Sequence, residues 1–227
     1  MDQRSVNFSL YLISDRKLAA AHGGLLAVIE AALQAAGDAA RTEAIAVQLR
    51  EKDLGGRELY ELAIALLPIC HRHAAPLLIN DRLDVAIAVG ADGVHLPSDG
   101  VPAHDARRLL GPSALIGIST HQAGEVEAAA CGGPNFAVFG PVFDPLSKPA
   151  HGVAGGAESL GAACRLASVP VYALGGITAE RIHRLRGTGA FAEGARPAGV
   201  GVIGAVMGAD HPGAATRALL EALAGWR

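Results

Sequence analysis

Short, almost uninterrupted apolar runs recur along the chain, and amphipathic stretches separate them. The runs expected to form strands are Ser9–Ser14, Ala44–Arg50, Pro76–Asp81, Gly93–Leu96, Leu115–Thr120, Phe136–Val142, Val169–Gly176 and Gly199–Ala205. A strand with one solvated face would alternate apolar and polar residues. A continuous apolar run indicates burial on both faces, as in a parallel sheet.

The segments between several of these runs carry apolar residues at helical spacing. Within Glu58–His73, one helix face would hold Leu59, Leu62, Ala63, Leu66 and Leu67. Pro68 is expected to kink this helix or end it early. Thr178 has the residue type of an N-cap. Further helices are expected at Asp105–Leu110, Gly124–Cys131, Glu158–Ala167, Thr178–Arg186 and Ala214–Trp226.

Eight expected strands, each followed by an expected helix, predict a (β/α)8 barrel, the TIM-barrel architecture, as a single domain over residues 1–227. The alternative is an open doubly wound sheet, which usually has fewer strands and a glycine-rich turn after the first one. Here Ser14-Asp15-Arg16 follows the first strand without a GxGxxG pattern, so we prefer the barrel.

Composition narrows the class of protein. The 227 residues are 51% hydrophobic and 18% charged, with a formal net charge of −3, which excludes a disordered chain and a broad basic surface for nucleic acid. No apolar run reaches the roughly 18 residues of a membrane span, and Met1–Arg4 lacks signal-peptide features. Three widely spaced cysteines without a CxxC pattern fit a reducing compartment. We expect a cytoplasmic protein without nucleic-acid or membrane partners; its oligomeric state, a homo-oligomer included, stays open.

Because barrel enzymes carry their sites at the carboxyl ends of the strands, polar residues there are the candidates. Gln48, Arg50 and Lys52 occupy alternate positions, which would turn their side chains the same way. Arg50 can bind two phosphate oxygens at once, and Lys52 and Lys148 supply point charges. The alternative is that residues 50–53 form a solvated loop with local ion pairs.

Two further strand ends extend this anion site. Asn80 and Asp81 end the third run, and a carboxylate beside cations predicts a bridging Mg²⁺ that also binds polyphosphate. Gly175-Gly176 opens a helix, where free N–H groups attract anions, and Gly204 ends the last run. The alternative for Gly175-Gly176 is a tight turn without a ligand.

Two histidines lie at strand ends, where a packing role is the more frequent one. His95 ends the fourth run, and His121 follows Ser119-Thr120 at the end of the fifth. His121 is the stronger candidate for direct chemistry.

Several motifs, in order, closely resemble the thiamine phosphate synthase/TenI superfamily. They are Gln48-Leu49-Arg50-Glu51-Lys52-Asp53, Ile79-Asn80-Asp81-Arg82, Gly90-Ala91-Asp92-Gly93-Val94-His95-Leu96, Ile116-Gly117-Ile118-Ser119-Thr120-His121, Phe139-Gly140-Pro141-Val142-Phe143 and Ala173-Leu174-Gly175-Gly176-Ile177-Thr178. The resemblance implies an enzyme of thiamine biosynthesis, a transferase that joins hydroxymethylpyrimidine diphosphate to a thiazole phosphate and releases diphosphate.

The resemblance also assigns expected roles to residues of this chain. The diphosphate pocket would be formed by Gln48, Arg50, Lys52, Asn80, Ser119 and Lys148, and Ser147 would be a further substrate-binding residue. The thiazole phosphate would lie at Gly176 and in the loop near Gly204. Ser119, His121 and Lys148 are the candidate catalytic residues. Asp81 would bind Mg²⁺, the expected cofactor.

Departures from the synthase pattern keep other functions open. Gly100 stands where synthases usually have a second magnesium ligand, so Asp99, one residue earlier, is the candidate replacement. Pro145 and Ser147 replace two threonines, and Gly204 replaces a serine. These changes favour a TenI-type thiazole tautomerase, an isomerase that needs no metal and uses His121 as proton shuttle. The intact Arg50, Lys52, Asn80, Asp81 and Lys148 favour the synthase. A non-catalytic barrel that binds thiazole phosphate or thiamine phosphate is the third reading.

Overall fold

The computed structural model describes residues 4–38, 45–130, 132–144, 155–191, 195–224 and 226. Eight parallel strands close into a barrel in sequence order, and β8 pairs with β1. The strands are β1 (Leu10–Ile13), β2 (Ile45–Leu49), β3 (Leu77–Asn80), β4 (Gly93–Leu96), β5 (Leu115–Thr120), β6 (Phe136–Phe139), β7 (Val171–Ala173) and β8 (Gly199–Val202). Each expected run contains one of these strands, so the predicted (β/α)8 barrel is confirmed.

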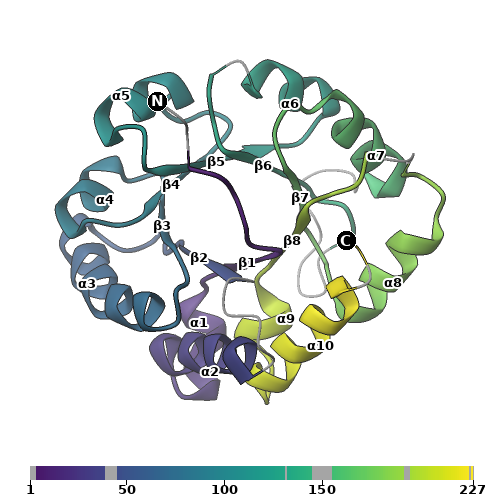
Figure 1. Ribbon diagram of the computed structural model, residues 1–227. Coiled ribbons are helices and arrows are strands. Elements are labelled where there is room, and N and C mark those ends of the chain that lie inside the picture. The colour runs from purple at the N-terminus through teal and green to yellow at the C-terminus, as the bar shows by residue number, and fades with distance from the viewer. Residues whose placement is uncertain are drawn as a thin grey trace.

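Helices surround the ring of strands (Figure 1). They are α1 (Arg16–Ala19), the 3-10 helix η1 (Ala20–His22), α2 (Leu25–Asp38), α3 (Gly56–Arg72), α4 (Leu83–Val89), α5 (Ala103–Leu110), α6 (Ala123–Ala130), α7 (Gly156–Leu166), α8 (Ala179–Gly187), α9 (Gly204–Met207) and α10 (Pro212–Ala224). None of the described helices has by itself the length and hydropathy to cross a membrane. The pair Arg16–His22 and Leu25–Gly37, bent by 79°, meets that criterion when its two members are joined.

Two details of the helices test the sequence patterns. Thr178 is the N-cap of α8, since its hydroxyl accepts a hydrogen bond from the Arg181 amide at 3.2 Å. The early end expected at Pro68 is wrong, because α3 continues to Arg72. Ile69 and Cys70, which follow the proline, are buried and stabilise the last turn of α3. This packing outweighs the backbone hydrogen bond that Pro68 cannot donate.

Side chains alternate along the strands between two separate apolar cores. Leu10, Leu12, Val47 and Leu49 belong to the larger core between strands and helices. The smaller core fills the inside of the barrel with Phe8, Tyr11, Ile13, Ala46, Leu78, Leu115, Phe136, Val138 and Tyr172. Because successive residues of a strand point to opposite faces, this alternation fixes which polar residues face the barrel axis.

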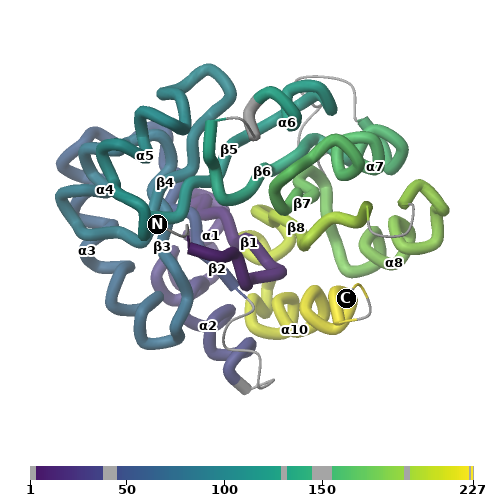
Figure 2. Tube along the Cα trace, turned by 45° about the horizontal axis from the view of Figure 1, so that its top comes forward, coloured from purple at the N-terminus to yellow at the C-terminus, as the bar shows by residue number. Residues whose placement is uncertain are grey.

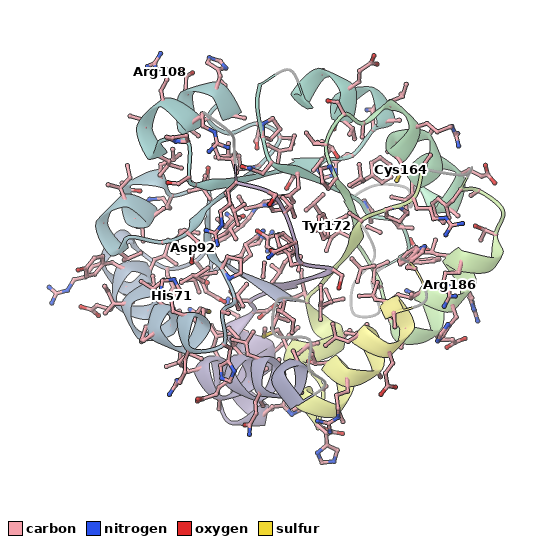
Figure 3. The ribbon with its side chains drawn as sticks, in the orientation of Figure 1. His71, Asp92, Arg108, Cys164, Tyr172 and Arg186 are labelled. Atoms are coloured by element: carbon pink, nitrogen blue, oxygen red, sulfur yellow. The ribbon has the colours of Figure 1, made fainter. Side chains whose placement is uncertain are left out.

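The amino-terminal end of the barrel is closed. Figures 1 and 2 show the N-terminal segment lying across this end, and Figure 3 shows Tyr172 inside the ring of strands. The Phe8 ring lies 4.9 Å from the Tyr172 ring and 5.3 Å from the Phe136 ring, and the Tyr172 hydroxyl donates to the Phe8 carbonyl at 2.6 Å. Among the described residues this packing closes the amino-terminal end, so a ligand site is expected at the carboxyl end of the barrel.

Candidate active site

Four polar side chains point into the barrel at its carboxyl end. Gln48 and Asn80 follow the inward-facing Ala46 and Leu78 by two residues each, and Ser119 follows Leu115 by four. His95 pairs with Asn80 across β3 and β4 and is 3% exposed. The same alternation that builds the inner core thus brings Gln48, Asn80, His95 and Ser119 to one mouth.

His95 and Ser119 are hydrogen-bonded to each other, with 2.9 Å between His95 Nε2 and Ser119 Oγ. Burial in the barrel, together with the positive charge of Arg50, lowers the pKa of His95 from 6.5 to about 3. His95 is therefore a neutral imidazole at neutral pH.

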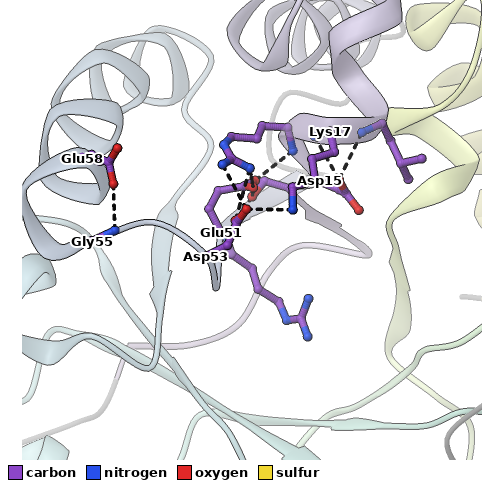
Figure 4. A network of polar contacts seen from close by, with 10 residues as sticks. Asp15, Lys17, Glu51, Asp53, Gly55 and Glu58 are labelled. Carbon is purple, nitrogen blue, oxygen red and sulfur yellow. Dashed lines mark hydrogen bonds and ion pairs between the residues drawn. The ribbon is translucent and has the colours of Figure 1, made fainter.

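Arg50 and Lys52 are left without acidic partners by a network in the neighbouring loop. Glu51 is buried and accepts hydrogen bonds from the Ser14 hydroxyl at 2.6 Å and the Arg16 amide at 3.0 Å. The alternative interpretation, a solvated loop, predicted ion pairs among residues 50–53. Instead, Asp53 pairs with Arg16 and with Lys17 (Figure 4). Among the described residues, neither Arg50 nor Lys52 makes a salt bridge, so both charges are available to an anion.

The expectation that strand alternation turns Gln48, Arg50 and Lys52 the same way applies to Gln48, which lies in β2, but not to Lys52. β2 ends at Leu49, and Lys52 lies exposed in the turn that follows. Arg50 is held at the strand end because its amide donates to the Ser14 hydroxyl at 2.8 Å.

Asp81 follows β3 directly and has a backbone φ of 64°, which is uncommon for a residue with a side chain. Its amide donates to the His95 carbonyl at 2.8 Å, and its carbonyl accepts from the Leu83 amide at 3.1 Å. No described residue forms a hydrogen bond or salt bridge with its exposed carboxylate. A residue that holds such a costly backbone conformation at the end of a strand is typical of functional sites.

Asp99 lies exposed in the Pro97–Gly100 turn after β4, on the loop next to Asp81. Within the described ranges, no group of three or more His, Cys, Asp or Glu residues converges on a metal site. Mg²⁺ bound to phosphates typically takes only one or two carboxylates from the protein, so Asp81 and Asp99 fit its donor chemistry. A side chain at Gly100 would meet the Pro97 ring at 2.9 Å, so an acidic residue there would displace the ring.

The glycine turn after β7 depends on the lack of side chains. Gly175 and Gly176 have φ values of 100° and 59°, and a Cβ at Gly176 would clash with Arg181 and with the Asp144 carbonyl. Arg181 donates to the carbonyls of Gly176 at 2.6 Å and Asp144 at 3.1 Å, which ties this turn to the loop after β6. Gly204 lies exposed after β8, the strand paired with β7.

His121 lies exposed at the end of β5, with Nδ1 2.6 Å from the Gly140 carbonyl oxygen. Since a carbonyl only accepts, Nδ1 carries the hydrogen, and Nε2 is the basic nitrogen. Ser147 and Lys148 lie outside the described residues.

Of the residues expected at the strand ends, Gln48, Asn80 and Ser119 lie together at the barrel mouth. The sequence pattern did not indicate the contacts of Arg181, nor that Glu51 binds Ser14 and Arg16 instead of Arg50.

A cavity of about 770 Å³ lies beside this mouth, at the ends of β4 and β5. Its lining includes Asp99 and Ser119 together with the apolar Leu96, Val101 and Ile118. Small-molecule sites typically occupy roughly 300 to 1,000 Å³ and combine apolar walls with few polar groups. The cavity thus provides a space for an organic ligand next to the predicted anion site.

The fold and the site define a class of protein: a (β/α)8 barrel with cationic, amide and carboxylate side chains at the carboxyl ends of its strands, a set of groups that fits phosphorylated ligands. The chain matches the model of the thiamine monophosphate synthase family over residues 10–195. It belongs to this family.

Two relatives that match this chain over most of their length are named thiamine-phosphate synthase. A thiamine-phosphate synthase of Salinispora tropica is 41% identical, covering 94% of this chain and 96% of the relative. One of Roseiflexus castenholzii is 39% identical, covering 95% and 88%. Among solved structures, a thiamine phosphate pyrophosphorylase from Pyrococcus furiosus is 30% identical, with a TM-score of 0.79 and 97% of each chain covered.

Proposed function

We propose that this chain is a magnesium-dependent thiamine-phosphate synthase. It would join hydroxymethylpyrimidine diphosphate to a thiazole phosphate and give thiamine phosphate and diphosphate. Membership of the family supports this reaction. The observation that carries the proposal is Arg50, which has no acidic partner in the described part of the chain, next to the inward-facing Gln48, Asn80 and Ser119 at one barrel mouth.

The diphosphate would bind to Gln48, Arg50, Lys52, Asn80, Ser119, Ser147 and Lys148. The bond from the pyrimidine methylene carbon to the diphosphate oxygen breaks, and the oxygen keeps the electron pair. The thiazole nitrogen then forms the new carbon–nitrogen bond. Fixed cations and hydroxyl donors accelerate this step because they stabilise the charge that develops on the leaving group.

Asp81 and Asp99 would hold the magnesium ion, which supplies further neutralisation of diphosphate charge when bound. Gly176 and Gly204 would bind the thiazole phosphate through the backbone. At Gly176 this fits a turn with no Cβ, since a ligand can approach the main chain closely there. This arrangement would bring two phosphorylated substrates to one mouth and orient them for reaction.

The direct test mixes the purified protein with both substrates and Mg²⁺ and measures thiamine phosphate and diphosphate. We expect equimolar formation of the two products, lost on addition of a chelator and restored by Mg²⁺. Absence of thiamine phosphate with a folded protein would reject the proposal. We place the reaction in the cytoplasm, in a single-domain protein with small phosphorylated molecules as partners.

A TenI-type thiazole tautomerase is the second candidate, and the geometry of His121 favours it. Because Nδ1 is bound to the Gly140 carbonyl, the exposed Nε2 can take up and return a proton. A tautomerase would turn over a thiazole carboxylate phosphate without metal and lose this activity in His121→Ala. Full activity of that variant would remove His121 from the mechanism. Binding of thiazole phosphate without any turnover would indicate the non-catalytic barrel.

A further inference from the structure

His95 is a buried polar group for which the proposed reaction has no direct use. Its ring lies below the mouth, 5.6 Å from the Tyr11 ring and 6.1 Å from the Phe136 ring, measured between centroids. Nε2 contacts Ser119 Oγ, whereas Nδ1 is buried and has no hydrogen-bond partner among the described residues. The two ring nitrogens therefore have opposite environments, which bears on where the single proton of a neutral imidazole resides.

The surroundings of Nδ1 favour a bare nitrogen. A Cβ at Gly117, the β5 partner of His95, would lie 2.7 Å from Nδ1, so the ring nitrogen packs against the Cα of this glycine. An N–H at Nδ1 would be a buried donor without an acceptor, which folded proteins rarely tolerate. A lone pair there instead faces C–H groups, a weakly favourable contact. The proton accordingly resides on Nε2.

The direction of the His95–Ser119 hydrogen bond decides what Ser119 can do. If Nε2–H donates to Oγ, the hydroxyl hydrogen of Ser119 stays free to point out of the barrel. If Nε2 accepted instead, that hydrogen would be used inside, and Ser119 would present only lone pairs to a ligand. An anion accepts hydrogen bonds and repels lone pairs, so only the first arrangement makes Ser119 an anion-binding residue.

We propose that His95 is a positioning residue whose Nε2–H donates to Ser119 Oγ and turns the Ser119 hydroxyl hydrogen toward an anion at the barrel mouth. That this anion is the substrate diphosphate rests on the proposed function; the direction of the hydrogen bond does not. His95 acts through Ser119 and touches no reacting atom.

The first test reads the tautomer directly. In ¹⁵N-labelled protein, long-range ¹H–¹⁵N correlations of the His95 ring distinguish a protonated from a bare nitrogen, and contacts to the Tyr11 and Phe136 rings assign the signal. We expect a neutral ring with the proton on Nε2 in the ligand-free protein. A proton on Nδ1, or a doubly protonated ring at neutral pH, would overturn the proposal.

The second test measures binding of inorganic diphosphate, in the presence of Mg²⁺, by calorimetry. The amide nitrogen of His95→Gln matches the position of Nε2 and can donate to Ser119, whereas His95→Asn places its amide at the position of Nδ1 and cannot. We expect His95→Gln to bind nearly as the wild type does. His95→Asn and Ser119→Ala should each weaken binding roughly ten- to a hundredfold, the contribution of a hydrogen bond to a charged group.

The combination of Ser119→Ala with His95→Asn separates positioning from general structural damage. If His95 acts through Ser119, the double variant binds diphosphate no more weakly than Ser119→Ala alone. Multiplied losses, or wild-type binding by His95→Asn, would contradict the proposal. If the wild-type chain itself binds no diphosphate, the proposed function fails, and the ring-proton measurement alone decides the role of His95.

Discussion

The Ser14 hydroxyl donates to the buried Glu51 carboxylate across 2.6 Å. The same oxygen accepts the Arg50 amide at 2.8 Å, so one side chain connects the loops after β1 and β2. Because Glu51 binds Ser14, it does not pair with the neighbouring Arg50. The hydrogen bond from the Arg50 amide also fixes the backbone from which the guanidinium extends. Preorganisation of this kind lowers the entropy cost of binding an anion.

Ser14→Ala should destabilise the protein by about 2 kcal/mol, because the buried Glu51 carboxylate loses one of its hydrogen-bond donors and the Arg50 amide loses its acceptor. We also expect weaker binding of diphosphate, since the Arg50 backbone loses its support. Urea unfolding measures the first effect and calorimetry the second. Ser113→Ala removes an exposed serine and is the matched control, expected to change neither. Equal stability of the two variants would show that the Ser14 bridge does not contribute.

Glu51→Gln tests how the pH acts on this bridge. Burial raises the pKa of Glu51 above 4.5 despite the hydrogen bond from Ser14. The folded state thus favours the protonated acid, and its stabilising effect is lost as the pH rises above 4.5 through the raised folded pKa. The glutamine does not ionise, so the variant should gain stability relative to the wild type over this pH range. Unfolding free energies of both proteins at several pH values check this; a constant difference would contradict it.

Arg50→Ala should weaken binding of the pyrimidine diphosphate roughly ten- to a hundredfold, because it removes a cation that can bind two phosphate oxygens. Lys52→Ala should act in the same direction, and both should affect the thiazole phosphate far less. Arg57 is the matched control, since its side chain is 91% exposed on α3 and pairs with Glu61. Equal losses for both ligands would contradict the placing of two separate anion sites.

Asp81 allows stability and function to be separated. Asp81→Ala and Asp81→Gly both remove the carboxylate, and both should lose magnesium-dependent activity. They differ in the backbone, because glycine adopts a φ of 64° without the penalty of about 1 kcal/mol that a Cβ brings. Asp81→Gly should therefore be the more stable of the two by this amount in urea unfolding. Magnesium activation that survives in both variants would exclude Asp81 as a ligand.

Gly176→Ala should lower both the Tm and the affinity for thiazole phosphate. The new methyl group would collide with Arg181 and the Asp144 carbonyl in a left-handed backbone. Gly187→Ala is the control, since nothing lies within 4 Å of its Cβ position in α8. The control should be neutral or slightly stabilised. Thermal melts and titration with the thiazole phosphate measure the two effects, and unchanged affinity in Gly176→Ala would place the phosphate elsewhere.

The apolar runs determined the strands because burial on both faces leaves a local mark on each segment. All eight strands lie within the expected runs. The strand-end rule included Gln48, Asn80 and Ser119 among its polar candidates, and the family resemblance assigned Ser119 to the diphosphate pocket. Pro68 shows the limit of such local rules. Its effect on α3 depends on which neighbours bury Ile69 and Cys70, and the helix pattern does not contain that information.

Only the tertiary structure decided how the charges pair. In the sequence, Arg50, Glu51, Lys52 and Asp53 are one alternating group, and local ion pairs are the natural expectation. In the barrel, β1 lies next to β2, so Arg16 and Lys17 take the two carboxylates and leave the two cations free. The direction of the His95–Ser119 hydrogen bond depends in the same way on Gly117 of the neighbouring strand. Sequence fixes which groups stand at the strand ends, and strand pairing decides which of them remain available to a ligand.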